Sequence, residues 1–384
     1  ANLFGIGGSS LIARCLGEQK FEKARHVSAF SVWAGFLFAA FYSVILLLFH
    51  PFILRLLGAG DGTFSYCRSY MFWTCVIGGI PTVMNPLLAH LVRSEGASKE
   101  ASIGVSLGGV INMILDPVFM FVLLPDGYEV MGAAMATMVS NCIAAIYFIV
   151  YILRHRASSV LTLSPREFSV QESIPADVVS IGLPSFLMTA LSSASNAVVN
   201  NLISEASSAA VAGMGIAKKI NMLSFRVSTG VTQGALPLIA YNHSAGNYTR
   251  MKRSIAGAAK ITVGFAAFCM CVSMLFGGGL VKLFIDDAAT VEFGQNFIHI
   301  ISLAMPLAAA TMTMMMFFQA SAKKAQATAL SMMRKGILDI PLMFLFNSVW
   351  PVYGVACATP VAEIIGCAVA LVLVWRYMRT LKGE

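Results

Sequence analysis

The chain has 384 residues, of which 58% are hydrophobic and only 11% are charged. A soluble globular protein carries about 25% charged residues, so this chain has too little polar surface to be coated by water. The composition therefore argues against a water-soluble enzyme. The formal net charge of +8 does not indicate a nucleic-acid-binding protein, because the basic residues gather in alternate loops between apolar segments, as in membrane proteins.

Apolar segments follow one another along the whole chain. A helix that crosses the bilayer needs about 20 apolar residues, and lipid leaves helices as the way to satisfy the backbone here, since no alternating strand pattern is present. The first segment is short and begins directly at Ala1, so we expect that a leading helix is absent. We predict eleven spans: 1–16, 28–50, 67–92, 101–123, 130–153, 176–204, 208–241, 255–277, 291–320, 326–349 and 353–376.

The loops between these segments give the orientation. Lysine and arginine are concentrated in every second loop and after the last segment, whereas the opposite loops and their edges hold few of them. Basic loops stay in the cytoplasm, so the C-terminus is predicted to be cytoplasmic. The basic set is Arg14, Lys20, Lys23, Arg25, Arg93, Lys99, Arg154, Arg156, Arg166, Arg250, Lys252, Arg253, Lys323, Lys324, Arg376, Arg379 and Lys382.

An internal repeat relates the two halves of the chain. The stretch ILDPVFMFVLLPDGYEVMGAAMAT (114–137) resembles ILDIPLMFLFNSVWPVYGVACAT (337–359). The offset spans six segments, and an even number keeps both copies in the same orientation across the membrane. We predict an all-α polytopic membrane protein of two pseudo-symmetric six-helix bundles. Its parts are an N-terminal lobe (1–153), a cytoplasmic linker (154–175) and a C-terminal lobe (176–384). The aligned pairs are Asp116 with Asp339, Gly132 with Gly354, and Thr137 with Thr359.

Asp116 is the strongest candidate for a functional residue. A charged side chain inside a membrane span is costly and therefore points to function. Asn112 lies one helical turn earlier on the same face, and Pro117 frees a backbone carbonyl in the same region. Thr137, on the next span, falls at a similar depth. We predict an ion-coupling polar network of Asp116, Asn112 and Thr137. Gly104 and Gly108 extend the same row, and we expect them to serve helix packing.

The second lobe has different residue types at the corresponding positions. Lys335 corresponds to Asn112 and lies one turn before Asp339, so this cluster can neutralise itself. Thr359 and Glu363 correspond to Thr137 and to Asn141. A structural role and a proton-handling role both stay open for the cluster of Lys335, Asp339, Thr359 and Glu363. The candidates for lining a substrate cavity are Arg226, Gln233, Met312 and Met316, although core or lipid-facing packing is the alternative for the methionines.

Motifs of enzymes and of resident cofactors are missing. The sequence has no zincin pair of histidines and no phosphate-binding P-loop, and Cys269 and Cys271 lack the partner pair of a zinc site. We interpret the eight cysteines as small packing residues. We therefore predict a protein that is not an enzyme and has no cofactor and no bound metal, apart from transient Na⁺ at Asp116.

Several stretches in order along both halves resemble the multidrug and toxic compound extrusion (MATE) family, prokaryotic branch. The most specific is QGALPLIAYNHSAGNYTRMK (233–252), and the others include GGSSLIARCLGEQKFEKAR (7–25), VRSEGASKEA (92–101), NMILDPVFMF (112–121) and GIAKKINML (215–223). The resemblance covers the family's second to twelfth helices. It implies two six-helix lobes and alternating access, with cationic or amphipathic toxic compounds exported in exchange for H⁺ or Na⁺. It also assigns Asp116, Asn112 and Thr137 to the N-lobe polar network.

Two rival functions remain open at this stage. The nearest is a lipid-linked oligosaccharide flippase of the wider superfamily, which would need basic residues in its cavity. The other is an intramembrane enzyme or a passive channel. The scattered single acids argue against the enzyme, and the repeat with proline-broken helices argues against a simple pore. We expect small molecules, H⁺ or Na⁺ and the lipid bilayer as partners, no nucleic acid, a monomer, and a location in a bacterial inner membrane.

Overall fold

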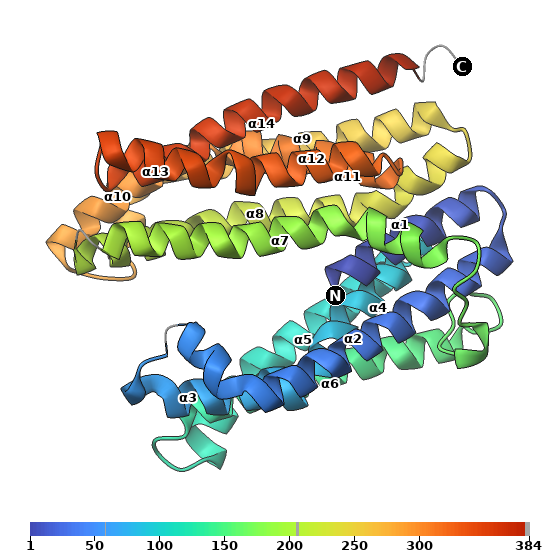
Figure 1. The fold of residues 1–384 in the computed structure, drawn as a ribbon, viewed down its shortest axis with the longest axis horizontal. Helices are drawn as coiled ribbons and strands as arrows, with labels where there is room; N and C mark the ends of the chain where they lie inside the picture. The colour runs from blue at the N-terminus through green and yellow to red at the C-terminus, as the bar shows by residue number, and fades with distance from the viewer. Residues whose placement is uncertain (58, 205–206, 381–384) are drawn as a thin grey trace. The chain divides into compact units, whose positions relative to one another are not determined.

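The computed structural model describes residues 1–57, 59–204 and 207–380, and within these ranges only helices and their connections are present (Figure 1). This confirms the predicted all-α class. The α-helices are α1 (Asn2–Gly17), α2 (Phe21–Leu56), α3 (Asp61–Met71), α4 (Gly79–Ser94), α5 (Ser98–Val118), α6 (Glu129–Arg154), α7 (Ile174–Ser204), α8 (Ser208–Ser244), α9 (Tyr248–Lys282), α10 (Ala288–Ser302), α11 (Met305–Ala320), α12 (Lys324–Met332), α13 (Asp339–Val349) and α14 (Tyr353–Thr380). The shorter elements are the π-helical turns η1 (Phe72–Ile77), η2 (Phe119–Leu123) and η4 (Met333–Ile337) and the 3₁₀ turn η3 (Pro165–Glu167).

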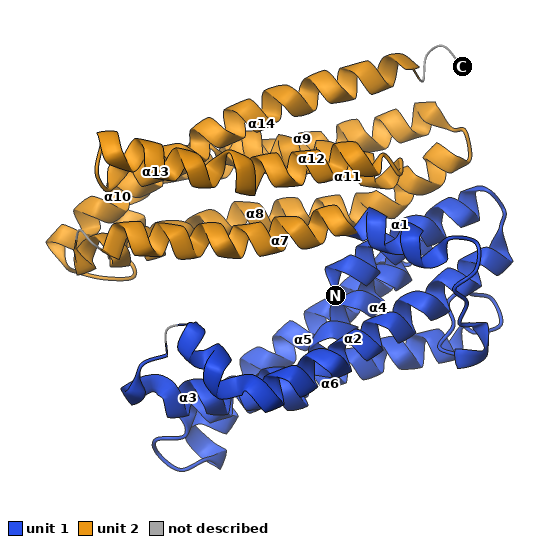
Figure 2. Cartoon of the chain, in the orientation of Figure 1, with its two compact units in different colours: residues 1–182 blue, residues 183–384 orange. Residues whose placement is uncertain are grey.

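The chain forms two compact units, residues 1–182 and 183–384, coloured blue and orange in Figure 2. Unit 1 contains α1 to α6 and the first turns of α7, and unit 2 contains the rest of α7 and α8 to α14. The start of α7 belongs to unit 1 because Ile174, Val178 and Ile181 are buried in its core. The lobe and linker boundaries expected from the sequence stay predictions.

Fewer segments than predicted pass a test for membrane spans. Among the described residues, six helices are long and apolar enough to cross a membrane, or eight if each of two bent helix pairs counts as one span. The other three of the eleven predicted segments correspond to α1, α8 and α12–α13. α1 has only 16 residues. The other two segments contain charged side chains, which lower their apolar character: Lys218, Lys219 and Arg226 in α8, and Arg334, Lys335 and Asp339 in α12–α13.

Prolines accompany the irregular turns inside the bundles. The π-helical turns η1 and η4 end at Ile77 and Ile337, four residues before Pro81 and Pro341. Because proline has no backbone N–H, the carbonyls of Ile77 and Ile337 lack their usual helical donors. η2 begins two residues after Pro117. The chain also bends by 52° between η1 and α4 and by 43° between α10 and α11. Helix breaks of this kind give backbone segments that can change conformation.

Each unit has its own apolar core and an apolar exterior. Leu87, Leu88 and Phe148 are fully buried in unit 1, and Phe297 is fully buried in unit 2. Large apolar side chains are also exposed along the outer surfaces of α2 and α9, for example Leu48 and Phe52 on α2 and Leu275 on α9. Burial inside and apolar exposure outside is the arrangement expected of helices that face lipid.

The segment between α6 and α7 lies against unit 1. The Glu95 carboxylate accepts hydrogen bonds of 2.6 Å from both Ser159 Oγ and the Val160 N–H. Trp33 Nε1 donates to the Leu163 carbonyl at 3.2 Å, and Leu161 is 2% exposed within the unit 1 core. The connection expected as an inter-lobe linker is therefore attached to unit 1 through its middle residues.

Candidate functional site

Asp116 lies near the C-terminal end of α5, within a candidate membrane span. Its Oδ1 accepts a hydrogen bond of 2.9 Å from Asn112 Nδ2, one turn earlier on the same helix. Both side chains are half-buried. In the part of the chain that the structure describes, no ion pair involves Asp116, so the carboxylate is held by an amide and not by a cation.

Thr137 does not join this pair by a hydrogen bond. Its hydroxyl donates to the Ala133 carbonyl of its own helix, α6, at 2.9 Å. Asn141, one turn further along α6, instead accepts a hydrogen bond of 2.9 Å from Asn85 Nδ2 of α4. The Asn85 Oδ1 is buried without a hydrogen-bond partner. Asn85 was missed from the sequence, where the polar residue beside Pro86 in an otherwise apolar segment was the available signal.

The cluster predicted in the second lobe forms around Asp339. This carboxylate is 0% exposed and accepts hydrogen bonds from Lys335 Nζ at 3.2 Å, Thr359 Oγ1 at 3.2 Å and Ser195 Oγ at 2.9 Å. The predicted proximity of Lys335, Asp339 and Thr359 is confirmed, and Ser195 of α7 is an addition that the sequence did not indicate. A buried carboxylate with one ammonium and two hydroxyl donors is fully compensated.

Glu363 belongs to a different pair. Both of its carboxylate oxygens accept hydrogen bonds from Arg334 Nε, at 2.6 and 2.8 Å, and both side chains are 2% exposed. Arg334 precedes Lys335 in the η4 turn, yet the two cations serve two different acids. The sequence showed two adjacent basic residues and two acids in neighbouring spans, but it gave no means to separate the pairs.

The two halves of the repeat use the same geometry with different charges. Asn112–Asp116 in unit 1 and Lys335–Asp339 in unit 2 occupy matching positions and have the same i, i+4 contact. The carboxylate is therefore neutralised in unit 2 and not in unit 1. A second pair of matching positions also differs in charge. Unit 2 has the buried Arg334–Glu363 pair where unit 1 has the uncharged residues Ile111 and Asn141.

Glycines at matching positions of the repeat also have the same packing role. A Cβ atom at Gly132 would lie 2.7 Å from the Phe119 carbonyl oxygen, and one at Gly354 would collide with the Phe346 carbonyl oxygen. In both units, the helix that follows the one with Asp116 or Asp339 therefore begins directly against the end of that preceding helix. Gly104 has no room for a Cβ atom beside Phe148, which confirms its expected packing role.

The cavity candidates differ in exposure within unit 2. Arg226 is exposed and Gln233 is half-buried, both on α8. Met312 and Met316 are 6% and 3% exposed on α11, so they pack inside unit 2. Their roles in lining a substrate cavity stay predictions.

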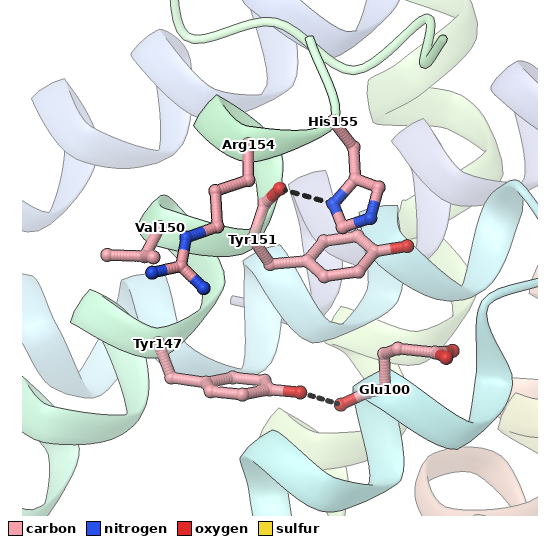
Figure 3. A pocket seen from close by; sticks show the side chains of 6 residues that line it. All are labelled: Glu100, Tyr147, Val150, Tyr151, Arg154 and His155. Atoms are coloured by element: carbon pink, nitrogen blue, oxygen red, sulfur yellow. Dashed lines mark hydrogen bonds between the residues drawn. The ribbon is translucent and has the colours of Figure 1, made fainter.

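A pocket of about 450 Å³ opens at the start of α5 and the end of α6 (Figure 3). The Tyr147 hydroxyl donates to the Glu100 backbone carbonyl at 3.3 Å, and the Tyr151 and His155 rings lie 4.3 Å apart. The predicted site residues are not part of its lining, and it lies at the end of two candidate spans. Its lining residues are Glu100, Tyr147, Val150, Tyr151, Arg154 and His155.

No metal centre is evident in the described ranges. Groups of three or more histidine, cysteine, aspartate or glutamate side chains that could hold a metal ion are absent there. The eight cysteines are free thiols, of which Cys15 and Cys367 are buried and Cys271 is exposed.

The helices, the repeat and the charged groups at membrane depth define a polytopic membrane protein with the architecture of a two-lobe transporter. The sequence model of the MatE family matches residues 1–118 and 184–345, and the chain belongs to this family.

Curated relatives agree with this assignment, and solved structures share the fold. The chain is 29% identical to the multidrug export protein MepA of Staphylococcus saprophyticus over 380 residues, which cover 98% of this chain and 82% of the relative. It is 28% identical to MepA of Staphylococcus aureus over 382 residues, with the same coverage. An outward-facing multidrug resistance MATE transporter of the MOP superfamily shares the fold with a TM-score of 0.90 at 22% identity, over 100% of this chain and 85% of that one.

Proposed function

We propose that the chain is a secondary active exporter of cationic or amphipathic toxic compounds. It exchanges them for H⁺ or Na⁺ by alternating access. The MatE family assignment and the MepA relatives, which are named as multidrug export proteins, support this proposal. We place it in the bacterial plasma membrane as a monomer. We propose a cytoplasmic C-terminus because the basic residues follow the pattern of cytoplasmic loops.

The observation that supports the coupling proposal is the hydrogen-bond partner of the Asp116 carboxylate. Its partner is the neutral amide of Asn112 at 2.9 Å, whereas Asp339, at the matching position, has the Lys335 ammonium. A carboxylate at membrane depth without a cation gains most from an incoming H⁺ or Na⁺. Asp116 is therefore the coupling residue, with Asn112 as the group that orients its carboxylate.

The neighbouring backbone provides a way to convert ion binding into movement. Pro117 follows Asp116 directly, and the π-helical turn η2 begins at Phe119. Neutralising Asp116 changes its hydrogen bond to Asn112 and with it the packing of this irregular turn. A local charge change that biases a two-state element is a common mechanism of switching. Thr137, bonded to its own helix, serves as a neighbour of this region and not as a direct ligand of Asp116.

The flippase alternative gains no support from the comparisons, since the relatives are named as multidrug export proteins. Its basic candidates are Lys218, Lys219, Arg226 and Lys335, and two of these four already have a partner. Lys335 is bound to Asp339, and Lys218 donates to Asn196 Oδ1 at 3.0 Å.

Dye efflux from proteoliposomes tests the proposal. The full-length protein is reconstituted, and efflux of a cationic dye is followed under an imposed pH gradient and then under a Na⁺ gradient. We expect one of the two gradients to drive efflux, and we expect the substitution Asp116→Asn to abolish the gradient-dependent component. Asp126→Asn, in the exposed connection between η2 and α6, is the matched control and retains wild-type efflux. Gradient-driven efflux by Asp116→Asn at the wild-type rate would refute the coupling role.

A further inference from the structure

Lys218 is a half-buried cation of α8 that the proposed coupling step does not use. It lies in α8, ten residues after Ser208, which places it about 15 Å along the helix at 1.5 Å per residue. Its Nζ donates a hydrogen bond of 3.0 Å to Asn196 Oδ1 of α7.

The surroundings of Lys218 contain more positive than negative charge. Lys218 lies within Coulombic range of Lys335 and Asp339. Asp339 is already bound by Lys335, and the Arg334–Glu363 pair next to it is neutral as a pair. Within the described part of unit 2, the two ammonium groups of Lys218 and Lys335 therefore share one carboxylate, and Lys218 itself is bonded to a neutral amide.

One side of this cluster is open and the other is closed. Asp339 and Ser195 are buried, at 0% and 5% exposure. Asn196 is exposed, Lys218 is half-buried, and the Lys335 side chain is 18% exposed. An incoming group can therefore reach Asn196, Lys218 and Lys335 more readily than the Asp339 carboxylate, which stays covered by its three donors.

We propose that Lys218 and Lys335, with Asn196 beside them, form a subsite for the carboxylate group of zwitterionic amphipathic substrates. This inference rests on the proposed export function and names a substrate class for it. A monoanion fits because the cluster has one positive charge in excess, whereas a dianionic phosphate would reverse the sign of the cluster. Lysine suits such a group because its ammonium is a compact charge with three donors.

The proposal makes Lys218 selective for one class of compound. A substrate with only a positive charge gains nothing from an ammonium group and is repelled by it. A substrate that carries a carboxylate in addition gains a charge-assisted hydrogen bond from the same group. Removing Lys218 should therefore separate the two classes and should not weaken both.

Two rhodamine dyes that differ in one methyl group provide the test. Rhodamine 123 is a methyl ester and a monocation, and rhodamine 110 is the corresponding free acid, which is zwitterionic when its carboxyl group is ionised. Transport by the full-length protein in proteoliposomes is measured for both, together with equilibrium binding to the detergent-solubilised protein by fluorescence polarisation. The variants are Lys218→Gln, which removes the charge, and Lys218→Arg, which keeps it. Lys219→Gln, an exposed neighbour, is the control.

We expect Lys218→Gln to weaken binding of the free acid and raise its transport KM by about tenfold or more, as the loss of a charge-assisted hydrogen bond predicts. The ester should change less than twofold, and its transport shows that the variant is folded. Lys218→Arg should retain most of the preference for the acid, and Lys219→Gln should leave both dyes unchanged.

Three results would overturn the subsite. They are equal effects of Lys218→Gln on both dyes, no effect on the acid, and wild-type protein that handles the ester but not the acid. If the wild-type protein moves neither dye under any gradient, the proposed export function fails, and the binding data still decide separately whether Lys218 recognises a carboxylate.

Discussion

The buried Arg334–Glu363 pair offers a quantitative test of how unit 2 tolerates charge in its interior. Both side chains are 2% exposed, and the Nε–oxygen distances are 2.6 and 2.8 Å. Removing one partner of such a pair leaves an uncompensated charge, which costs about 3–5 kcal/mol. We therefore expect Arg334→Ile and Glu363→Asn, taken singly, to destabilise the protein strongly. For a unit of this size the loss corresponds to a decrease in Tm of about 6–20 °C.

The double variant is the informative one, because unit 1 already has the same two uncharged residue types at the matching positions. Ile111 and Asn141 stand at the matching positions of the repeat. Replacing a buried ion pair by a neutral pair of similar volume is often close to neutral. We expect the Arg334→Ile, Glu363→Asn double variant to recover most of the Tm lost by either single variant.

Heat unfolding of the purified protein in detergent, followed by fluorescence, measures all three variants. Glu292→Gln, an exposed acid on α10, is the matched control and should leave Tm unchanged. The double-mutant cycle gives the coupling energy between the two side chains. A double variant that loses the sum of the two single losses would refute the reasoning, since it would mean that each side chain acts without the other.

Two further predictions concern unit 1. Gly104→Ala should lower Tm by about 2–12 °C, because a Cβ atom there collides with Phe148 and overpacking costs about 1–3 kcal/mol. The control Gly109→Ala, which meets open space, should not lower Tm, and equal losses would contradict the packing role. Glu95→Ala should release the segment around Ser159 and increase trypsin cleavage there without abolishing folding, as measured by limited proteolysis and gel analysis; an unchanged cleavage rate would show that this carboxylate does not hold the segment.

The sequence was sufficient for the class, the order of the helices and the repeat. Apolar segments of span length and the matching of 114–137 with 337–359 depend on composition and spacing, which are visible without coordinates. A hydropathy test alone finds fewer spans than we predict, since α8 and α12–α13 contain charges, some of which are compensated by neighbours in the folded bundle. Such compensation depends on contacts between distant residues, and hydropathy along the chain does not report it.

The candidate site shows the same limit at the level of single residues. Asn112–Asp116 and Lys335–Asp339 were predictable because residues four apart on a helix lie on one face. Arg334 was missed because its partner lies on α14, 29 residues further along the chain. Thr137 and Thr359 occupy matching positions, yet only Thr359 reaches an acid, because the Thr137 hydroxyl donates to its own helix.

The docked segment after α6 has a practical consequence for protein engineering. Whether a reporter domain or a protease site can be inserted into this long connection depends on the exact position. Here insertion between Ser159 and Leu163 would break the bonds to Glu95 and Trp33 and expose Leu161. The stretches around Arg156 and Val170 are exposed, so these are the positions where a tag can be tolerated.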